Sequence, residues 1–259
     1  MKKTFKPKTQ YYQSYTDDFV ESGNQSFQLP DSYIWAHDSL LYRIVSKCIY
    51  TLAVFCAFIY CRCYLHIKIK NRSVLRQYPK SGYFLYCNHT QPVGDAFIPM
   101  RVLAPSCCYI VAAPANLGIP ILGRLLPMLG ALPAPDSLSG MKKLHAAIRL
   151  RIMQKKCVVI YPEAHVWPWY TGIRPYPAAS FGFPVACDAP SFCMTAAYQK
   201  RKLAGRPKMT LYLDGPFLPD HSLPPKERKE QLRQNIYECM LKRSQNSNYE
   251  YIHYENGEA

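Results

Sequence analysis

Short apolar runs alternate with longer runs of helical spacing along the chain from residue 65 onward. Residues 65–70 alternate apolar and polar side chains one by one, which is the pattern of a half-buried strand. Further apolar runs, which predict buried strands, lie at residues 82–87, 107–113, 157–161, 192–198 and 209–213. Apolar residues at helical spacing predict helices over 141–156 and from Pro225 onward, where a proline suits the first helical turn. This alternation predicts an α/β fold with a mixed, largely parallel sheet flanked by helices.

The chain before residue 65 has a different pattern. Residues 1–36 are polar and lack the apolar centre of a secretory signal, so we expect a loosely ordered N-terminal tail. Residues 48–61 carry no charge, yet this run is shorter than the roughly 20 residues that a membrane-spanning helix needs. Basic residues and aromatic rings flank it, as at the interface between lipid and water. We therefore expect an interfacial or re-entrant helix within residues 37–64, with a buried core helix as the alternative.

The composition narrows the class of partner. The chain has 259 residues, of which 49% are hydrophobic and 19% charged, as in a globular protein with a full core. Its formal net charge of +15 indicates an anionic partner, such as a membrane surface, nucleic acid or an acidic carrier protein. The basic residues are scattered and no nucleic-acid-binding motif accompanies them, so we expect no nucleic-acid partner. The 11 cysteines lie in apolar runs rather than at metal-ligand spacing, which indicates buried free thiols in a reducing compartment.

The segment that follows the predicted strand 82–87 carries the first candidate catalytic residues. It reads Asn-His-Thr-Gln-Pro-Val-Gly-Asp and ends at Asp95, so that His89 and Asp95 lie a few positions apart. An imidazole accepts a proton at neutral pH, and a neighbouring carboxylate fixes its tautomer and stabilises the imidazolium that forms. The pair therefore suits the activation of a hydroxyl group. The alternative is that Asn88, Asp95 or both only cap a turn or a helix.

A second polar cluster follows the predicted strand 157–161. The loop 162–176 contains Glu163, His165 and Arg174 together with several aromatic side chains. Ligands of open α/β sheets bind beyond the carboxyl ends of the strands, and loops of this composition commonly bind a substrate. The alternative is that the two tryptophans of the loop pack under the sheet, while Glu163 and Arg174 form a solvated ion pair.

In order and spacing these motifs resemble the blocks of the glycerolipid (lysophospholipid) acyltransferase family, whose first block is Asn-His-x-x-x-x-Asp. His89 and Asp95 match this first block. Residues 118–131, punctuated by Pro and Gly, match the second block, and Tyr161 to Ala164 match the Phe-Pro-Glu-Gly start of the third. The resemblance covers about residues 42–212 and includes an apolar N-terminal helix of the kind that the family uses for membrane docking.

The resemblance implies transfer of an acyl chain from a thioester to a hydroxyl of a lysophospholipid-like or other lipid acceptor. The thioester would be acyl-coenzyme A or an acylated carrier protein, which are co-substrates, and neither a cofactor nor a metal is expected. His89 would act as the general base, and Asp95 would orient it. The residues expected to bind substrate are Asn88, Glu163, His165 and Arg174.

The resemblance also implies a domain organisation and a location. The expected regions are a polar tail (1–36), an apolar helix region (37–64), an acyltransferase domain (65–245) and a C-terminal tail (246–259). We expect the protein to associate with the cytoplasmic side of a membrane, where an anionic membrane surface would be its partner.

Three departures from the family pattern bear on substrate recognition. Five residues rather than four separate His89 from Asp95, which requires a different turn; Gly94 can allow one because glycine tolerates unusual dihedrals. The family's Gly-Thr-Arg continues here as Ala-His-Val, and the arginine that commonly ends the second block is absent. Arg174 is the candidate to replace these arginines, since a guanidinium binds phosphate in a fork. Otherwise the acceptor carries another headgroup.

Two other functions stay open on the sequence alone. His89, Asp95, Glu163 and His165 are residue types that hold a divalent metal in hydrolases, although the block of Pro and Gly between them has no role in such a site. The second alternative is a non-catalytic protein of the same fold that binds membrane lipid. Retention of both His89 and Asp95 argues against it.

Overall fold

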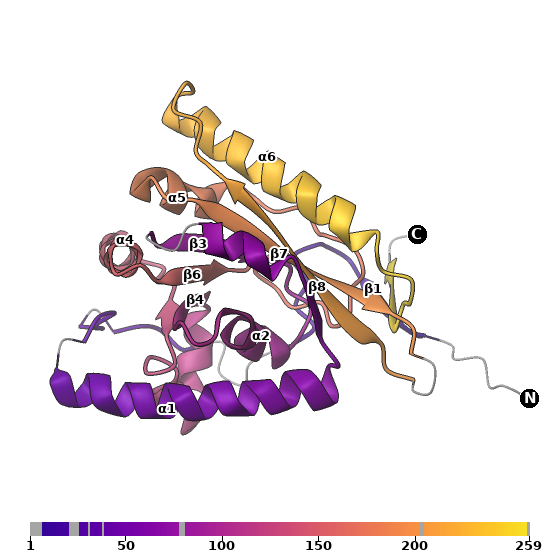
Figure 1. Ribbon diagram of the computed structural model, residues 1–259, viewed down its shortest axis with the longest axis horizontal. Coiled ribbons are helices and arrows are strands. Elements are labelled where there is room, and N and C mark those ends of the chain that lie inside the picture. Colours follow the sequence, from indigo (N-terminus) through magenta and orange to yellow (C-terminus); the bar gives the residue numbers. More distant parts are fainter. Residues whose placement is uncertain are drawn as a thin grey trace, which may run out of the picture.

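The computed structural model describes residues 7–20, 26–30, 32–37, 39–77, 81–201 and 205–257. Its centre is a seven-stranded sheet in the order β2-β8-β7-β3-β6-β4-β5 (Figure 1). The strands are β2 (Lys68–Lys70), β3 (Tyr83–Cys87), β4 (Cys108–Ala112), β5 (Ala131–Pro133), β6 (Cys157–Ile160), β7 (Ser191–Gln199) and β8 (Lys208–Phe217). Neighbouring strands pair in parallel, except that β7 and β8 are antiparallel. The predicted mixed, largely parallel sheet is therefore confirmed.

Two strands differ in extent from the sequence pattern. β2 covers only Lys68–Lys70, because the backbone of His66 has a positive φ of 49° that interrupts the extended chain before it. β5, at Ala131–Pro133, was not predicted. It has only three residues, of which one is proline, so its apolar pattern is too short to identify a strand.

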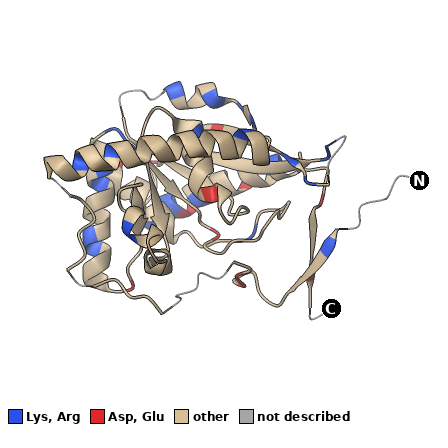
Figure 2. Cartoon of the chain, turned by 90° about the horizontal axis from the view of Figure 1, so that it is seen from below, with Lys and Arg blue, Asp and Glu red and all other residues tan. Residues whose placement is uncertain are grey.

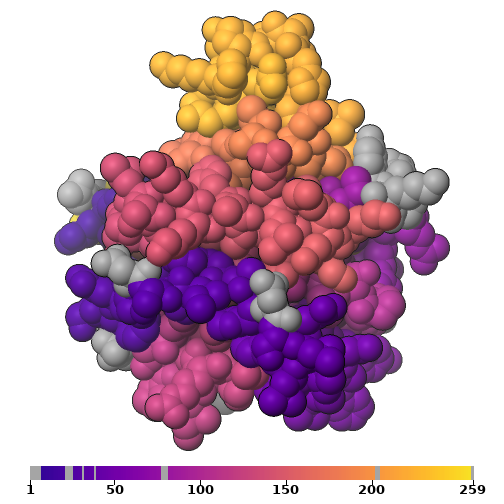
Figure 3. All heavy atoms as spheres, turned by 90° about the vertical axis from the view of Figure 1, so that its left-hand side faces the viewer, coloured from indigo at the N-terminus to yellow at the C-terminus, as the bar shows by residue number. Residues whose placement is uncertain are grey.

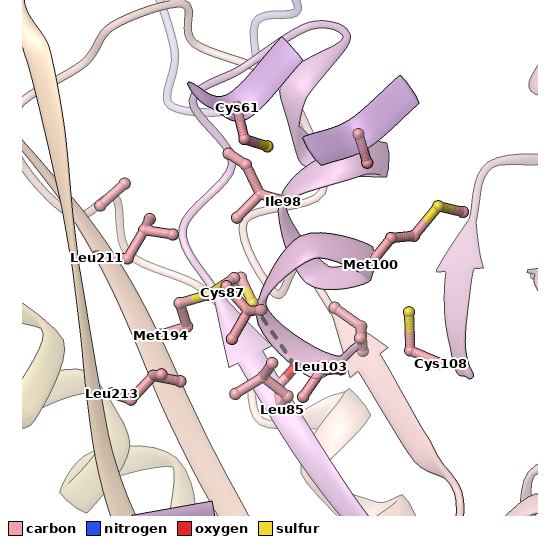
Figure 4. Close-up of a cluster of buried hydrophobic side chains, with 14 of the residues drawn as sticks. Cys61, Leu85, Cys87, Ile98, Met100, Leu103, Cys108, Met194, Leu211 and Leu213 are labelled. Atoms are coloured by element: carbon pink, nitrogen blue, oxygen red, sulfur yellow. Dashed lines mark hydrogen bonds between the residues drawn. The ribbon is translucent and has the colours of Figure 1, made fainter. Parts of the chain in front are cut away.

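Helices cover both faces of the sheet (Figure 1). On one face lie α1 (Leu40–Ile59), which continues into a π-helical turn (Tyr60–Tyr64), and α2 (Gly94–Leu103); on the other lie α4 (Leu138–Met153), α5 (Gly182–Cys187) and α6 (Pro225–Ser244). Successive side chains of a strand point to opposite faces. Leu85 of β3 accordingly packs under α2 beside Leu103 (Figure 4), whereas Phe84 packs with Leu144 and Ile236 on the other face.

The first helix is longer than the sequence pattern predicts. With its π-helical turn it covers Leu40–Tyr64, 25 residues that are long and apolar enough to cross a membrane by length and composition. The uncharged run 48–61 is therefore only part of a longer helix, because residues on both sides of the run also join it. One side of this helix lies against the domain: Tyr50, Ala57 and Cys61 are buried, and the Tyr50 hydroxyl accepts a hydrogen bond from the Cys108 amide at 3.0 Å.

The cysteines are free thiols, as predicted, but they are not uniformly buried. Cys48, Cys56 and Cys63 are exposed. They lie on the side of α1 and its π-helical turn that faces away from the domain, where an apolar sequence run does not imply a covering layer of protein.

The two ends of the chain pair with each other. β1 (Lys8–Tyr12) and β9 (Ile252–Asn256) form a parallel two-stranded sheet beside the main one. The expectation of a loosely ordered tail was wrong for the residues of β1, which have a fixed partner. Local sequence patterns do not show this pairing, because the partner strand lies at the other end of the chain.

Candidate active site

The candidate catalytic pair lies at the carboxyl end of β3, a central strand of the sheet. β3 ends at Cys87, and α2 begins at Gly94, so that Asp95 occupies the first turn of this helix. The Asp95 Oδ2 atom accepts hydrogen bonds from His89 Nδ1 at 2.7 Å and from the Gln91 amide at 2.9 Å. The longer spacing between histidine and aspartate therefore still brings the two side chains into contact.

Gly94 permits this turn for a different reason from the one expected. Its φ is not positive; instead, a Cβ atom at this position would lie 2.8 Å from the Gln91 Cβ. Close packing, rather than an unusual dihedral angle, requires glycine there.

The side chain of Asp95 is buried, and its carboxyl group is hydrogen-bonded. Burial raises the pKa of the Asp95 carboxyl, while its hydrogen bond with His89 opposes this shift. Tyr161 lies over His89, with ring centroids 4.4 Å apart, and donates its hydroxyl to the Asp95 carbonyl at 2.6 Å. The imidazole is thus held on one face by Tyr161 and at Nδ1 by Asp95, which leaves Nε2 as the nitrogen that can accept a substrate proton. The side chain of His89 is 19% exposed.

Asn88 connects the catalytic segment to the neighbouring strand. Its side-chain amide donates to the Ala196 carbonyl at 3.3 Å and accepts from the Ala196 amide at 2.8 Å. Nearby, the hydroxyl of Tyr198 bonds Thr90 at 2.7 Å and accepts from Gln91 Nε2 at 3.1 Å. Both amide atoms of Asn88 are engaged with β7, so its place in the structure is that of a support rather than of a substrate ligand.

Glu163 and Arg174 form a buried ion pair behind the catalytic segment. Glu163 Oε2 accepts from Arg174 Nη2 at 3.0 Å and from the His89 amide at 3.1 Å, while Oε1 accepts from the Arg174 amide at 3.1 Å. The side chains of Arg174 and Glu163 are 1% and 0% exposed. The expectation that Arg174 grips an acceptor phosphate is corrected by this burial, and so is the alternative of a solvated pair. Sequence spacing shows that the two residues are available to pair, but not that protein encloses them.

The third block is covered by the N-terminal segment. The Trp167 indole donates to the Asp17 carbonyl at 2.8 Å, and Arg174 Nη1 donates to the Tyr15 carbonyl at 3.1 Å. His165 remains partly exposed at 37%, with its ring nitrogen 3.5 Å from Asp18. Of the four residues expected to bind substrate, His165 alone keeps a substantially exposed side chain. Ala164 has a φ of 63°, a left-handed conformation that explains why the family pattern has glycine at this position.

Two tyrosines of the site were missed by the sequence reasoning. Tyr161 and Tyr198 both bond the catalytic segment, yet each reads as one more apolar residue at the end of a buried strand. The available signal was their position at the carboxyl ends of strands, where an aromatic ring with a hydroxyl can serve both the core and the site.

The set proposed for a metal hydrolase does not converge. Glu163 is occupied by Arg174, and the His165 ring lies beside Asp18. Within the described part of the chain, the group of side chains close enough to share a metal is Cys193, Asp214 and Cys239. Both carboxyl oxygens of that aspartate bond Arg243, at 2.5 and 2.8 Å, so the cluster already has its cation.

Comparison with known proteins shows what this α/β fold, with a histidine and an aspartate paired at the end of a central strand, is similar to. Residues 66–178 match the family model described as Acyltransferase. The fold is similar to the crystal structure of the 1-acyl-sn-glycerophosphate (LPA) acyltransferase PlsC from Thermotoga maritima, with a TM-score of 0.54 and 11% identity over 80% of this chain and 83% of that one. A search of curated proteins finds no match. The family match over residues 66–178 and the shared fold support the resemblance to the glycerolipid acyltransferase family that the order of the motifs indicates.

Proposed function

We propose that the protein transfers a fatty acyl chain from a thioester to a hydroxyl of a lipid acceptor, with His89 as general base. The observation that carries the proposal is the contact of 2.7 Å between His89 Nδ1 and Asp95 Oδ2. With Nδ1–H donated to Asp95, Nε2 carries the free lone pair. This is the tautomer that a general base needs.

The chemistry requires one proton to move twice. His89 Nε2 takes the proton of the acceptor hydroxyl as its oxygen attacks the thioester carbonyl carbon. The tetrahedral intermediate then collapses, the carbon–sulfur bond breaks, and the leaving thiolate receives the proton from the imidazolium. Asp95 stabilises the imidazolium between these steps, as the carboxylate of a catalytic triad does. No covalent acyl-enzyme, metal or cofactor takes part; the acyl donor, acyl-coenzyme A or an acylated carrier protein, is a co-substrate.

The proposed acceptor is a lipid whose binding does not require the arginines of the family pattern. The third block carries Ala-His-Val in place of Gly-Thr-Arg, and Arg174 is enclosed by protein. We therefore propose a lysophospholipid-like or other hydroxylated lipid whose recognition does not depend on those arginines. Of the residues proposed to contact it, His165 has the most accessible side chain.

We further propose that the protein works on the cytoplasmic side of an anionic membrane, with the exposed side of α1 in contact with lipid. The helix carries Leu41, Leu52 and Phe55 with exposed fractions of 71%, 65% and 61%. Its opposite side packs on the domain, so it can lie along a membrane surface while it stays attached to the fold.

The test is thiol release from acyl-coenzyme A and acylated carrier protein in the presence of lysophospholipid and glycolipid acceptors. We expect acceptor-dependent release by the wild type and a loss of about 10²- to 10⁴-fold in kcat for His89→Ala. His221→Ala is the matched control, because His221 is an exposed histidine that lies outside the site. Undiminished turnover of the His89 variant would contradict the mechanism. If the wild type binds lipid but releases no thiol with any pair, the non-catalytic alternative is favoured.

A further inference from the structure

The segment between β4 and β5 carries an apolar tip with a strained backbone. The tip consists of Ile121 and Leu122, at the start of the short helix α3 (Leu122–Leu125), and their exposed fractions are 82% and 44%. Ile121 has a φ of 62° and a ψ of −59°, and the Leu122 amide donates to the Pro120 carbonyl at 2.6 Å. This geometry is the rare and strained form of the γ-turn, and a β-branched residue is poorly suited to it.

Hydrogen bonds and close packing hold the backbone of the tip in place. The Gly123 amide bonds the Ile119 carbonyl at 2.8 Å, and the Leu126 amide bonds the Leu122 carbonyl at 3.1 Å. Gly123 also lies so close to the Leu117 carbonyl that a side chain would not fit there. The fold therefore holds Ile121 in a fixed position outside the core, where most of its side chain gains no packing energy within the chain, and it leaves Leu122 partly exposed beside it.

The tip lies on the same side of the molecule as the exposed face of α1. The segment between β4 and β5 reaches the bottom edge of the molecule next to α1, as Figures 1 and 3 show from two directions. The exposed apolar residues of α1 recur at helical spacing and so form one face; they include Leu41, Ile44, Leu52, Phe55 and Ile59. The segment that carries the tip therefore lies on the same side of the molecule as the exposed apolar residues of α1.

The charge of the side that carries α1 and the tip indicates which kind of partner covers it. Residues 39–135, which supply α1, α2 and α3, contain ten Lys and Arg residues and a single acidic residue, the buried Asp95. Figure 2 looks at this side, where basic residues outnumber acidic ones. Apolar side chains among basic ones suit a bilayer that contains anionic lipid, because the lipid tails accept the former and the headgroups attract the latter.

We propose that the tip of Ile121 and Leu122 inserts into an anionic lipid bilayer and forms a second membrane contact beside α1. A single helix that lies on a surface leaves the domain free to roll about the helix axis. A second contact on the same side removes that freedom and fixes the height of His89 above the lipid. The inference rests on the proposed function in that a membrane-borne acceptor needs this alignment, but the contact itself is measured by binding.

Binding of the purified full chain to vesicles of equimolar phosphatidylcholine and phosphatidylglycerol, measured by co-sedimentation, tests the proposal. Ile121→Asn is expected to lower the partition coefficient about tenfold, as the loss of one inserted aliphatic side chain predicts. Its Tm should be unchanged or higher, because asparagine accepts a positive φ more readily than isoleucine. Leu122→Gln should also weaken binding. Leu218→Gln is the matched control, since Leu218 is 55% exposed in the loop that follows β8, on the α6 side of the sheet.

Each outcome decides between occupants of the surface. Equal partitioning of the Ile121 variant and the wild type, or an equal loss in the Leu218 variant, overturns the proposal. A wild type that dimerises without lipid and becomes monomeric on Ile121→Asn would show that a second copy covers the tip, and would also overturn it. A second variant, Ile121→Trp, should be quenched by brominated lipid within the bilayer, and an unquenched tryptophan contradicts insertion. Vesicle binding that depends on Ile121 but occurs without any acyl transfer supports the contact while removing the proposed function.

Discussion

Burial favours the protonated form of the Asp95 carboxyl group, whereas the proposed function needs its charged form. Burial raises the pKa of Asp95, because the charged form loses its hydration, while the proposed mechanism needs that charged form beside His89. Its hydrogen bonds with His89 and Gln91 offset part of the cost of ionisation. A residue that serves function at the expense of stability has this signature.

Asp95→Asn is expected to separate the two effects. Without the carboxylate that orients His89, kcat should fall by about 10²- to 10⁴-fold with little change in KM. The raised pKa means that Asp95 contributes its stability fully below the ordinary carboxyl pKa of about 4 and loses it as the pH rises through the folded-state value. The free energy of unfolding of the variant should therefore gain on the wild type as the pH rises from about 4 to 7, as urea unfolding would measure.

Asp220→Asn provides the control for this pH dependence. The Asp220 carboxyl accepts hydrogen bonds from Ser222, which lower its pKa. The wild type should therefore lose stability relative to this variant as the pH falls below about 4, and the difference should stay nearly constant from about 4 to 7. Transferase activity should not change in this control. A wild type that gains stability relative to Asp95→Asn over the same pH range would show that burial of Asp95 is not the dominant effect.

Glu163→Ala is expected to damage the fold rather than substrate recognition alone. It leaves the Arg174 guanidinium buried without its carboxylate and removes the acceptor of the His89 amide. Breaking such a pair costs about 3–5 kcal/mol, which chemical denaturation would measure. Glu230→Ala is the control: its ion pair with Arg233 is exposed, and the loss should stay within about 1 kcal/mol. A normal free energy of unfolding with a raised KM for the acceptor would restore the substrate-binding role for this pair.

At the scale of secondary-structure elements, β1 and β9 act on the site through the third block. The ring centroid of Tyr12, in β1, lies 4.7 Å from that of Trp167. The ring of Tyr254, in β9, stacks on Trp167 with centroids 4.9 Å apart. The backbone of the same loop reaches the catalytic segment, since the amides of Trp167 and Trp169 donate to the carbonyls of His89 and Thr90 at 3.1 and 2.9 Å. The ends of the chain thus stabilise a loop that in turn supports His89, the proposed general base.

Tyr12→Ala is expected to loosen this loop. Loss of the aromatic contact should cost about 1 kcal/mol and speed hydrogen exchange at the Trp167 and Trp169 amides, while the amides of α4 remain protected. Tyr11→Ala is the matched control, because Tyr11 is the neighbouring tyrosine of β1 and is 64% exposed. Equal exchange rates in the two variants would show that the pairing of the termini does not support the site.

At the scale of the whole molecule, the two faces of the main sheet differ in what covers them. The face covered by α4, α5 and α6 has a helical layer of its own, which buries side chains such as Phe84 and Leu144. The face covered by α1 and α2 carries the catalytic pair at its edge and leaves an apolar, basic surface uncovered. Residues 39–135, which supply the helices of this face, carry ten basic residues and one acidic residue, so this face can meet anionic lipid on the side of the proposed general base.

The sequence by itself determined the elements whose information is local. Period-two and helical patterns are written in consecutive residues, so the strands near 82–87 and 157–161 and the long helix after Pro225 were found within a few residues. The catalytic pair was also accessible, because His89 and Asp95 belong to one short segment that ends β3 and begins α2. The resemblance to the acyltransferase family also followed from the order of such segments, and the family match over residues 66–178 and the shared fold support it.

Only the tertiary structure decided what depends on partners distant in the sequence. Burial of Arg174 needs Glu163 on one side and Tyr15 on the other, and no pattern around Arg174 announces that enclosure. The pairing of β1 with β9 joins the two ends of the chain, and the strain at Ile121 arises from how the turn is closed. In each case the environment of a side chain is set by neighbours that folding brings together, so the residue type shows what the side chain can do and the fold decides what it does.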